Sequence, residues 1–269
     1  MSNPLSLRRP RRFDGQVAWI TGAGSGIGQA CAIAFAERGA DVVLSGRRPG
    51  PLELVADACR ARGVKATVAT ADVTDPASLQ AAVDTALSTH KRLDLVLANA
   101  GCSVSGRISE LTPEEWRRQL DINVIGLAST VQVALPALTA QGGRIGLVGS
   151  VMAFLGLPRS GAYAASKAAV RAIGDTLHLE LSGTGVTVNA LNPGHIKTAM
   201  GLGRSVSGWR SAVGRALGVL FRETLEVGAD RIVTMVTAPQ YDNVSGAFIY
   251  EDHEKPPNRL AFDNDIVEQ

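Results

Sequence analysis

Short apolar runs alternate with segments of helical periodicity along most of the chain. The first run, residues 16–21, reads QVAWIT and is predicted to be a short buried strand. In the segment that follows, Ile27, Cys31 and Phe35 recur at i, i+4 and i+8, which places them on one face of a helix. Gly39 is expected to end this helix.

The same alternation continues almost to the C-terminus. Further strands are predicted over residues 41–46, 65–73, 93–101, 142–150, 186–194 and 246–252, and further helices over 51–63, 76–90, 112–138, 160–177 and 223–237. The helix over 112–138 should begin with Thr112 as N-cap and Pro113 in its first turn, and be interrupted near Asn123. Strands that are apolar almost throughout are typical of a parallel sheet covered on both faces. The sequence therefore predicts an α/β fold, a single-domain doubly wound Rossmann fold with a seven-stranded parallel sheet flanked by helices.

Three stretches differ from this pattern. Residues 1–12 form a basic arm with four arginines between positions 8 and 12, and the domain itself is predicted over 13–252. Within the domain, residues 195–222 are rich in Gly, Ser and Arg with scattered large apolar residues, which suggests a segment that covers a substrate. Residues 253–269 form a polar tail. The arm is interpreted as a solvated terminus, and a peripheral membrane contact through it stays open.

Composition and charge exclude several classes of protein. A net charge of +2 over 269 residues does not favour a nucleic-acid partner. The three cysteines have no metal-like spacing, so no metal site is predicted, and their odd number argues against a disulfide framework and for a reducing cytoplasm. No apolar run approaches the ~20 residues of a transmembrane helix.

A glycine-rich turn joins the first strand to the first helix, in the sequence TGAGSGIGQA of residues 21–30. Gly22 permits the sharp turn, Gly26 lets the backbone approach a pyrophosphate, and Gly28 allows close packing of the helix. The helix N-terminus can then present its free N–H groups to the anion. We therefore predict that a dinucleotide is held by Gly22, Ser25, Gly26, Ile27 and Gly28.

The end of the second strand distinguishes the two nicotinamide dinucleotides. An acidic residue there would bind the ribose 2′-OH, but the sequence LSGRRPG offers Ser45, Arg47 and Arg48, with Asp41 at the opposite end of the strand. Arginine suits the bidentate recognition of a 2′-phosphate. NADP(H) is therefore favoured, and NAD(H) remains an alternative.

Tyr163 and Lys167 stand four residues apart in an alanine-rich helix, which places them on the same helical face. Transfer of a hydride to a carbonyl carbon needs a proton donor at the developing alkoxide, and an adjacent ammonium is expected to lower the pKa of the tyrosine. Ser150 lies at the C-terminal end of the strand over 142–150 and can donate a hydrogen bond to the substrate oxygen.

Taken together, these motifs resemble the short-chain dehydrogenase/reductase family from about Phe13 to Tyr250. The matching positions are Thr21–Gly28, Asp72–Val73, Asn99–Ala100–Gly101, Asn123, Ser150, Tyr163 with Lys167, and Pro193–Gly194 followed by Ile196 and Thr198.

The resemblance implies roles for several of these residues. Asp72 and Val73 would contact the adenine, and Ile196 and Thr198 the carboxamide end of the nicotinamide. Asn123 would support a water that links Lys167 to solvent. The residues that are also expected to bind the cofactor are Asn99, Ala100, Gly101, Tyr163, Lys167, Pro193 and Gly194. The C-terminal tail departs from that of many family members and looks more like the tail of retinol-dehydrogenase-like branches. The family resemblance implies a homodimer or homotetramer, and this departure leaves a monomer open.

The expected substrate is a hydrophobic ketone or secondary alcohol, because the residues after Ser150 and within 195–222 are mostly apolar. A steroid-like, lipid-like or aromatic compound would fit such a rim. Two alternatives stay open. One is a 3-oxoacyl thioester reductase of the same family, suggested by scattered arginines, and the other is a non-catalytic NADP-binding regulator.

Overall fold

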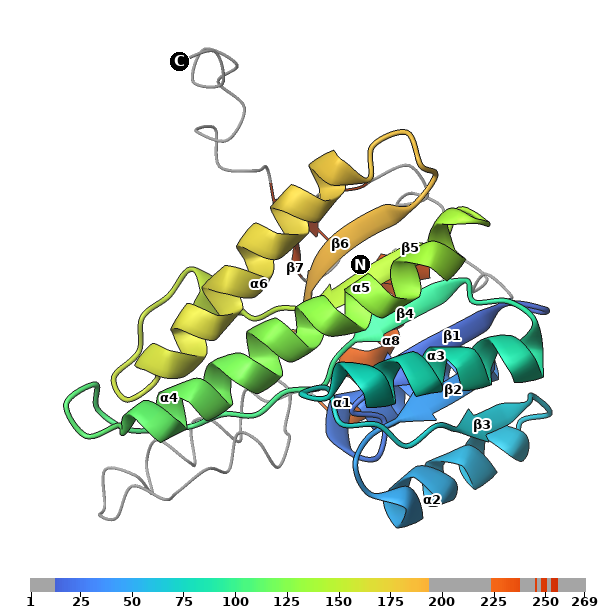
Figure 1. Ribbon diagram of the computed structural model, residues 1–269, viewed down its shortest axis with the longest axis horizontal. Helices are drawn as coiled ribbons and strands as arrows, with labels where there is room; N and C mark the ends of the chain where they lie inside the picture. Colours follow the sequence, from blue (N-terminus) through green and yellow to red (C-terminus); the bar gives the residue numbers. More distant parts are fainter. Residues whose placement is uncertain (1–12, 194–223, 238–244, 246–247, 251–252, 256–269) are drawn as a thin grey trace, which may run out of the picture.

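The computed structural model describes residues 13–193, 224–237, 245, 248–250 and 253–255 (Figure 1). The basic arm, the segment 195–222 and the tail from residue 256 lie outside the described residues. So do Gly194, Ile196 and Thr198 among the predicted cofactor contacts.

A single sheet forms the centre of the described structure, with strands in the order β3-β2-β1-β4-β5-β6-β7-β8. The first seven strands in this order run parallel, as predicted. The eighth, β8, pairs antiparallel with β7. The strands are β1 (Val17–Thr21), β2 (Asp41–Ser45), β3 (Ala66–Val68), β4 (Leu95–Ala98), β5 (Arg144–Val148), β6 (Thr187–Asn192), β7 (Phe248–Tyr250) and β8 (His253–Lys255). The sequence did not predict β8, because His-Glu-Lys carries none of the apolar character of a buried strand.

Helices cover both faces of the sheet, and the side chains of β1 and β2 alternate between two cores. One core joins Ile20 and Leu44 to α1 (Gly26–Glu37), α2 (Pro49–Arg60) and α8 (Leu225–Thr237). The other joins Trp19 and Val43 to α3 (Pro76–His90), α5 (Gly126–Thr139) and α6 (Gly161–Glu180), which lie in front of the sheet in Figure 1. This is the predicted doubly wound arrangement.

A long helical rod runs from Pro113 to Thr139 and consists of α4 (Pro113–Leu120), the π-helical turn η2 (Asp121–Ile125) and α5. As predicted, Thr112 caps it, in a reciprocal capping box with Glu115, and the interruption falls at Asn123. Among the described residues, this rod has the length and apolar composition that could span a membrane. Its apolar residues Leu127, Val131 and Leu138 are buried in the second core, so it serves here as a core helix.

Ser45 ties three strands together at the end of β2. Its hydroxyl accepts a hydrogen bond from Trp19 Nε1 at 2.8 Å and donates one to the carbonyl oxygen of Ala69 at 2.6 Å. Trp19 and Ser45 are both almost completely buried. A buried polar group of this kind must be hydrogen-bonded, because water cannot replace the lost partner.

The substitution Ser45→Ala should therefore lower the free energy of unfolding by about 1–3 kcal/mol, since it leaves the buried indole N–H and a carbonyl without this partner. Urea denaturation measures the change. Ser88→Ala removes an exposed hydroxyl from α3 and serves as the matched control, with an expected change within about 0.5 kcal/mol. Equal stability of the two variants would contradict this role of Ser45.

Candidate active site

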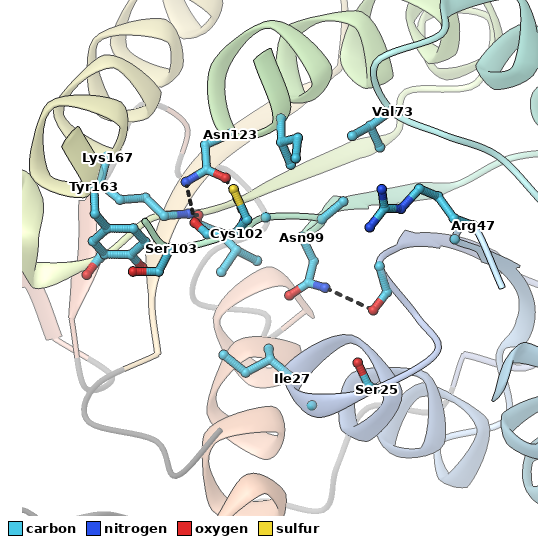
Figure 2. A pocket seen from close by; sticks show the side chains of 18 of the residues that line it. Ser25, Ile27, Arg47, Val73, Asn99, Cys102, Ser103, Asn123, Tyr163 and Lys167 are labelled. Carbon is cyan, nitrogen blue, oxygen red and sulfur yellow. Dashed lines mark hydrogen bonds between the residues drawn. The ribbon is translucent and has the colours of Figure 1, made fainter. Parts of the chain in front are cut away.

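A cleft of about 1230 Å³ lies at the carboxyl ends of the parallel strands. Each of the strands β1 to β6 contributes the residues that follow it, so the cleft spans the switch in strand order between β1 and β4. Most of the predicted site residues line it: Gly22, Ser25, Gly26, Ile27, Ser45, Arg47, Arg48, Asp72, Val73, Asn99, Ala100, Gly101, Asn123, Ser150, Tyr163, Lys167 and Pro193. Figure 2 shows Tyr163 and Lys167 at one end and Arg47 at the other.

The glycine-rich turn forms one wall of the cleft and begins α1. Gly22 adopts a φ of +68°, and a Cβ there would lie 2.9 Å from Ala100 Cα. Gly28 lies just outside the cleft lining, and a Cβ on it would come within 2.4 Å of the Gly22 carbonyl oxygen. Both positions therefore require glycine for the turn to form.

The start of α1 is suited to bind an anion. Ser25 is the N-cap residue but makes no side-chain capping bond, and the first turn of the helix contains no acidic residue. Ser25, Gly26 and Ile27 line the cleft, so the N–H groups at this helix end face a space that a ligand can enter. A dinucleotide pyrophosphate fits this set of donors.

The loop after β2 carries the residues predicted to select the dinucleotide. Arg47 and Arg48 are exposed and line the cleft, as a phosphate contact requires. The Ser45 hydroxyl, which was also predicted to contribute, is buried and bonded to Trp19 and Ala69, so it has no hydrogen left to donate to a cofactor. Ser45 is therefore a structural residue.

Asp72 follows β3 at the same end of the cleft. Hydrogen bonds from the backbone and side chain of Thr74, together with the positive charge of Arg47, hold the pKa of Asp72 below its usual value. The carboxylate oxygen Oδ1 accepts from Thr74 N at 3.0 Å and from Thr74 Oγ1 at 2.8 Å. The loop around Asp72 and Val73 is thus rigidly bonded where it lines the cleft.

Asn99 joins the ends of β4 and β1 in the middle of the cleft. Its side-chain amide donates to the Thr21 carbonyl oxygen at 2.9 Å, and its backbone N–H donates to Thr21 Oγ1 at 3.1 Å. Ala100 N also donates to Thr21 Oγ1, at 3.2 Å. These bonds fix the floor against which a bound molecule would lie.

Tyr163 and Lys167 project from the same face of α6 into the cleft, as their spacing predicts. Lys167 is 5% exposed, and its Nζ donates a 2.7 Å hydrogen bond to the Val148 carbonyl oxygen while lying 5.7 Å from the centre of the Tyr163 ring. Burial lowers the pKa of Lys167 to about 8.

The pKa of Tyr163 differs from the expectation. Burial of the phenol raises this pKa, a side-chain hydrogen bond with Ser150 opposes the rise, and the Cys102 thiol adds to it once it is ionised. The lowering expected from the Lys167 ammonium, which donates to the Val148 carbonyl oxygen and lies 5.7 Å from the centre of the Tyr163 ring, does not outweigh this burial. Tyr163 is therefore a neutral phenol at neutral pH.

Ser150 has two hydrogen-bonding functions. Its Oγ accepts from Met152 N at 3.2 Å and so caps the short helix η3 (Val151–Ala153). The same side chain bonds to Tyr163. The cap fixes the position of the hydroxyl beside the phenol.

Asn123 is buried, and its side chain is used within the protein. Nδ2 donates to the Cys102 carbonyl oxygen at 3.0 Å and to Ser166 Oγ at 3.1 Å, and Oδ1 accepts from Cys102 N at 2.8 Å. Because both amide hydrogens are taken, the predicted water link to Lys167 does not run through an N–H of this side chain.

Several residues that line the cleft were not among the predicted site residues. The helix α4 and the turn η2 contribute charged side chains, and the loop after β4 contributes small ones: Cys102, Ser103, Glu114, Arg117, Arg118 and Asp121. The loop after β5 contributes Val151, Met152 and Leu157, which belong to the apolar rim that the sequence predicts. Cys102 and Ser103 directly follow Asn99–Gly101, and this adjacency was a usable signal. Nothing local in the sequence indicates that α4 borders the cleft.

Comparisons with known proteins agree with this geometry. The sequence model of the family described as short chain dehydrogenase matches residues 16–205. A cyclohexanol dehydrogenase of Acinetobacter sp. (strain SE19) is 35% identical over 193 residues, which cover 70% of this chain and 76% of that protein.

Two solved structures share the fold at 29% sequence identity. They are a short chain dehydrogenase from Mycobacterium paratuberculosis bound to NAD and one from Burkholderia cenocepacia J2315 in complex with NADP. Each has a TM-score of 0.78 and covers 88% of this chain and 96% of its own. The family match spans well over half of the chain and includes the glycine-rich turn and the Tyr163–Lys167 pair. The chain therefore belongs to the short-chain dehydrogenase family of oxidoreductases.

Proposed function

We propose that the protein transfers a hydride between NADP(H) and a hydrophobic ketone or secondary alcohol. One observation carries this proposal: a single cleft has the Ser150, Tyr163 and Lys167 side chains at one end and exposed arginines at the other. Between the two ends lies an uncapped helix N-terminus that suits a pyrophosphate.

The nicotinamide, when bound, supplies or accepts the hydride. The Tyr163 hydroxyl donates its proton to the substrate oxygen, and the Ser150 hydroxyl donates a second hydrogen bond that holds this oxygen in place. With a pKa of about 8, Lys167 is mostly charged at neutral pH, and its charge stabilises the phenolate that remains after proton transfer. Because burial raises the pKa of Tyr163, the phenol keeps its proton at neutral pH and can donate it to the substrate oxygen during ketone reduction.

The preference for NADP(H) rests on the loop after β2. Arg47 and Arg48 are exposed at the cleft, and residues 45–51 contain no carboxylate that could bind a ribose 2′-OH. Asp72 is engaged with Thr74 and lies within the electrostatic influence of Arg47. The two solved relatives bind NAD in one case and NADP in the other, so this loop is the feature on which the proposal depends.

The proposal of a hydrophobic substrate depends on the residues that line the cleft near Tyr163. Val151, Met152 and Leu157 line the cleft on the loop after β5, and Leu157 is 57% exposed. An exposed apolar wall favours a substrate with an apolar body. The relative named cyclohexanol dehydrogenase supports a cyclic alcohol or ketone of this kind.

Replacement of Tyr163 by Phe should lower kcat for ketone reduction by about 100-fold or more, because the proton donor is lost. NADPH oxidation is measured by absorbance with cyclohexanone, acetophenone, a 3-oxosteroid and the sugar xylulose. NADPH binding, followed by its fluorescence, should be unchanged in this variant. If wild-type protein binds NADPH but oxidises it with none of these compounds, the proposed function is wrong and a regulatory role is favoured.

Replacement of Arg47 and Arg48 by Ser should raise KM for NADPH by at least about 10- to 100-fold, because the loss of even one charge-assisted hydrogen bond costs about 1.5–3 kcal/mol. KM for NADH should change little. Arg62→Ser removes an exposed arginine that pairs with Glu37 and does not line the cleft, so it is the matched control. A wild-type preference for NADH would contradict this interpretation.

The rate of ketone reduction should be nearly constant from pH 6 to about 7 and fall through a pKa of about 8, at which Lys167 loses its proton and its charge. The profile of kcat/KM between pH 6 and 10 measures this effect. In Lys167→Arg the side chain stays charged, so the decrease near pH 8 should disappear from whatever activity remains. The same decrease in both proteins would assign it to another group.

A further inference from the structure

Two buried amide side chains hold the loop that follows Asn99–Gly101. Gln119 Oε1 accepts from Val104 N at 2.7 Å, and Gln119 Nε2 donates to the Cys102 carbonyl oxygen at 2.8 Å. Asn123 bonds to both the N–H and the carbonyl of Cys102. Gln119 and Asn123 are four residues apart on the helical rod, so they face the loop together.

This arrangement determines where the loop backbone lies. Gln119 is 0% exposed and Asn123 is 1% exposed, so each amide depends on these hydrogen bonds. The bonds reach the residues on either side of Ser103, namely Cys102 and Val104. The position of Ser103 is therefore set by the helical rod, although Ser103 lies in a loop.

Ser103 itself points its side chain into the cleft. It is exposed, it lines the cleft with Tyr163, and Figure 2 draws both side chains at the same end. In the described part of the chain its hydroxyl has no hydrogen-bond partner. The hydroxyl is thus held in place and is available to a ligand.

We propose that Ser103 is a specificity-determining residue that hydrogen-bonds a second oxygen of the substrate, on the carbon next to the reacting one, and that Gln119 positions it. This inference rests on the proposed function. The reacting oxygen already has Ser150 and Tyr163 as donors, so a further hydroxyl at this end of the cleft meets a different substrate group. The neighbouring Cys102 does not supply that contact, because burial raises the pKa of its thiol and keeps it neutral and a weak donor.

An α-hydroxy ketone carries such a second oxygen. One neutral hydrogen bond contributes about 0.5–1.5 kcal/mol, which corresponds to a preference of about 2- to 10-fold in kcat/KM over the parent ketone. The ratio of the two kcat/KM values isolates this contribution, since a general loss of folding or of cofactor binding lowers both values equally.

The test compares cyclohexanone with 2-hydroxycyclohexanone, or acetophenone with 2-hydroxyacetophenone where the aromatic ketone is the better substrate. Ser103→Ala should lower the ratio of kcat/KM for the hydroxy ketone to kcat/KM for the parent ketone about 2- to 10-fold. Ser105→Ala is the matched control, because Ser105 lies on the same loop outside the cleft lining and its Oγ donates to the Arg159 carbonyl oxygen at 3.3 Å. The control should retain the wild-type ratio.

Gln119→Leu tests the positioning role. It should lower the same ratio, mainly by raising KM for the hydroxy ketone, and the double variant with Ser103→Ala should show no further decrease, since both changes remove one interaction. If Gln119→Leu does not fold, Ser103→Ala alone decides the proposal.

The outcomes separate the two proposals. An unchanged ratio in Ser103→Ala, with normal turnover of the parent ketone, overturns the assignment of Ser103 and leaves the proposed function intact. Absence of ketone-dependent NADPH oxidation in the wild-type protein overturns the proposed function and this inference with it.

Discussion

The parallel direction of β1 to β6 is the constraint on which the cleft depends. Parallel strands end at one edge of the sheet, so the glycine-rich turn, the arginine loop, Asn99 and Ser150 meet there although they are far apart in the sequence. The helices on both faces bury most of the residues of β1 to β6. The loops can therefore carry polar side chains without weakening the core.

Burial determines the chemistry of the two residues on α6. Lys167 is removed from water, and the Val148 carbonyl oxygen satisfies one of its donors. The same burial moves the pKa of Lys167 down and that of Tyr163 up, toward the neutral form in each case. A protonated phenol with a lysine nitrogen 5.7 Å from the centre of its ring results.

The helical rod from Pro113 to Thr139 connects the core to the cleft. Its α5 part buries Leu127 and Val131 against the sheet. Its α4 part borders the cleft, and the Gln119 side chain of α4 bonds to the loop after β4. The π-helical turn between them contains Asn123, whose side chain reaches both that loop and Ser166 on α6. Packing in the core thereby sets the geometry of a loop at the site.

The sequence by itself determined the features that depend on neighbouring residues: the alternation of strands and helices, the glycine-rich turn, the interruption at Asn123 and the shared face of Tyr163 and Lys167. Periodicity and turn chemistry act over a few residues, so these features can be recognised locally. Only the tertiary structure decided that the Ser45 hydroxyl is bonded to Trp19, that burial raises the pKa of Tyr163, and that Gln119 holds the loop of Ser103. Each of these depends on contacts between distant segments and on their removal from water, which local sequence patterns do not encode.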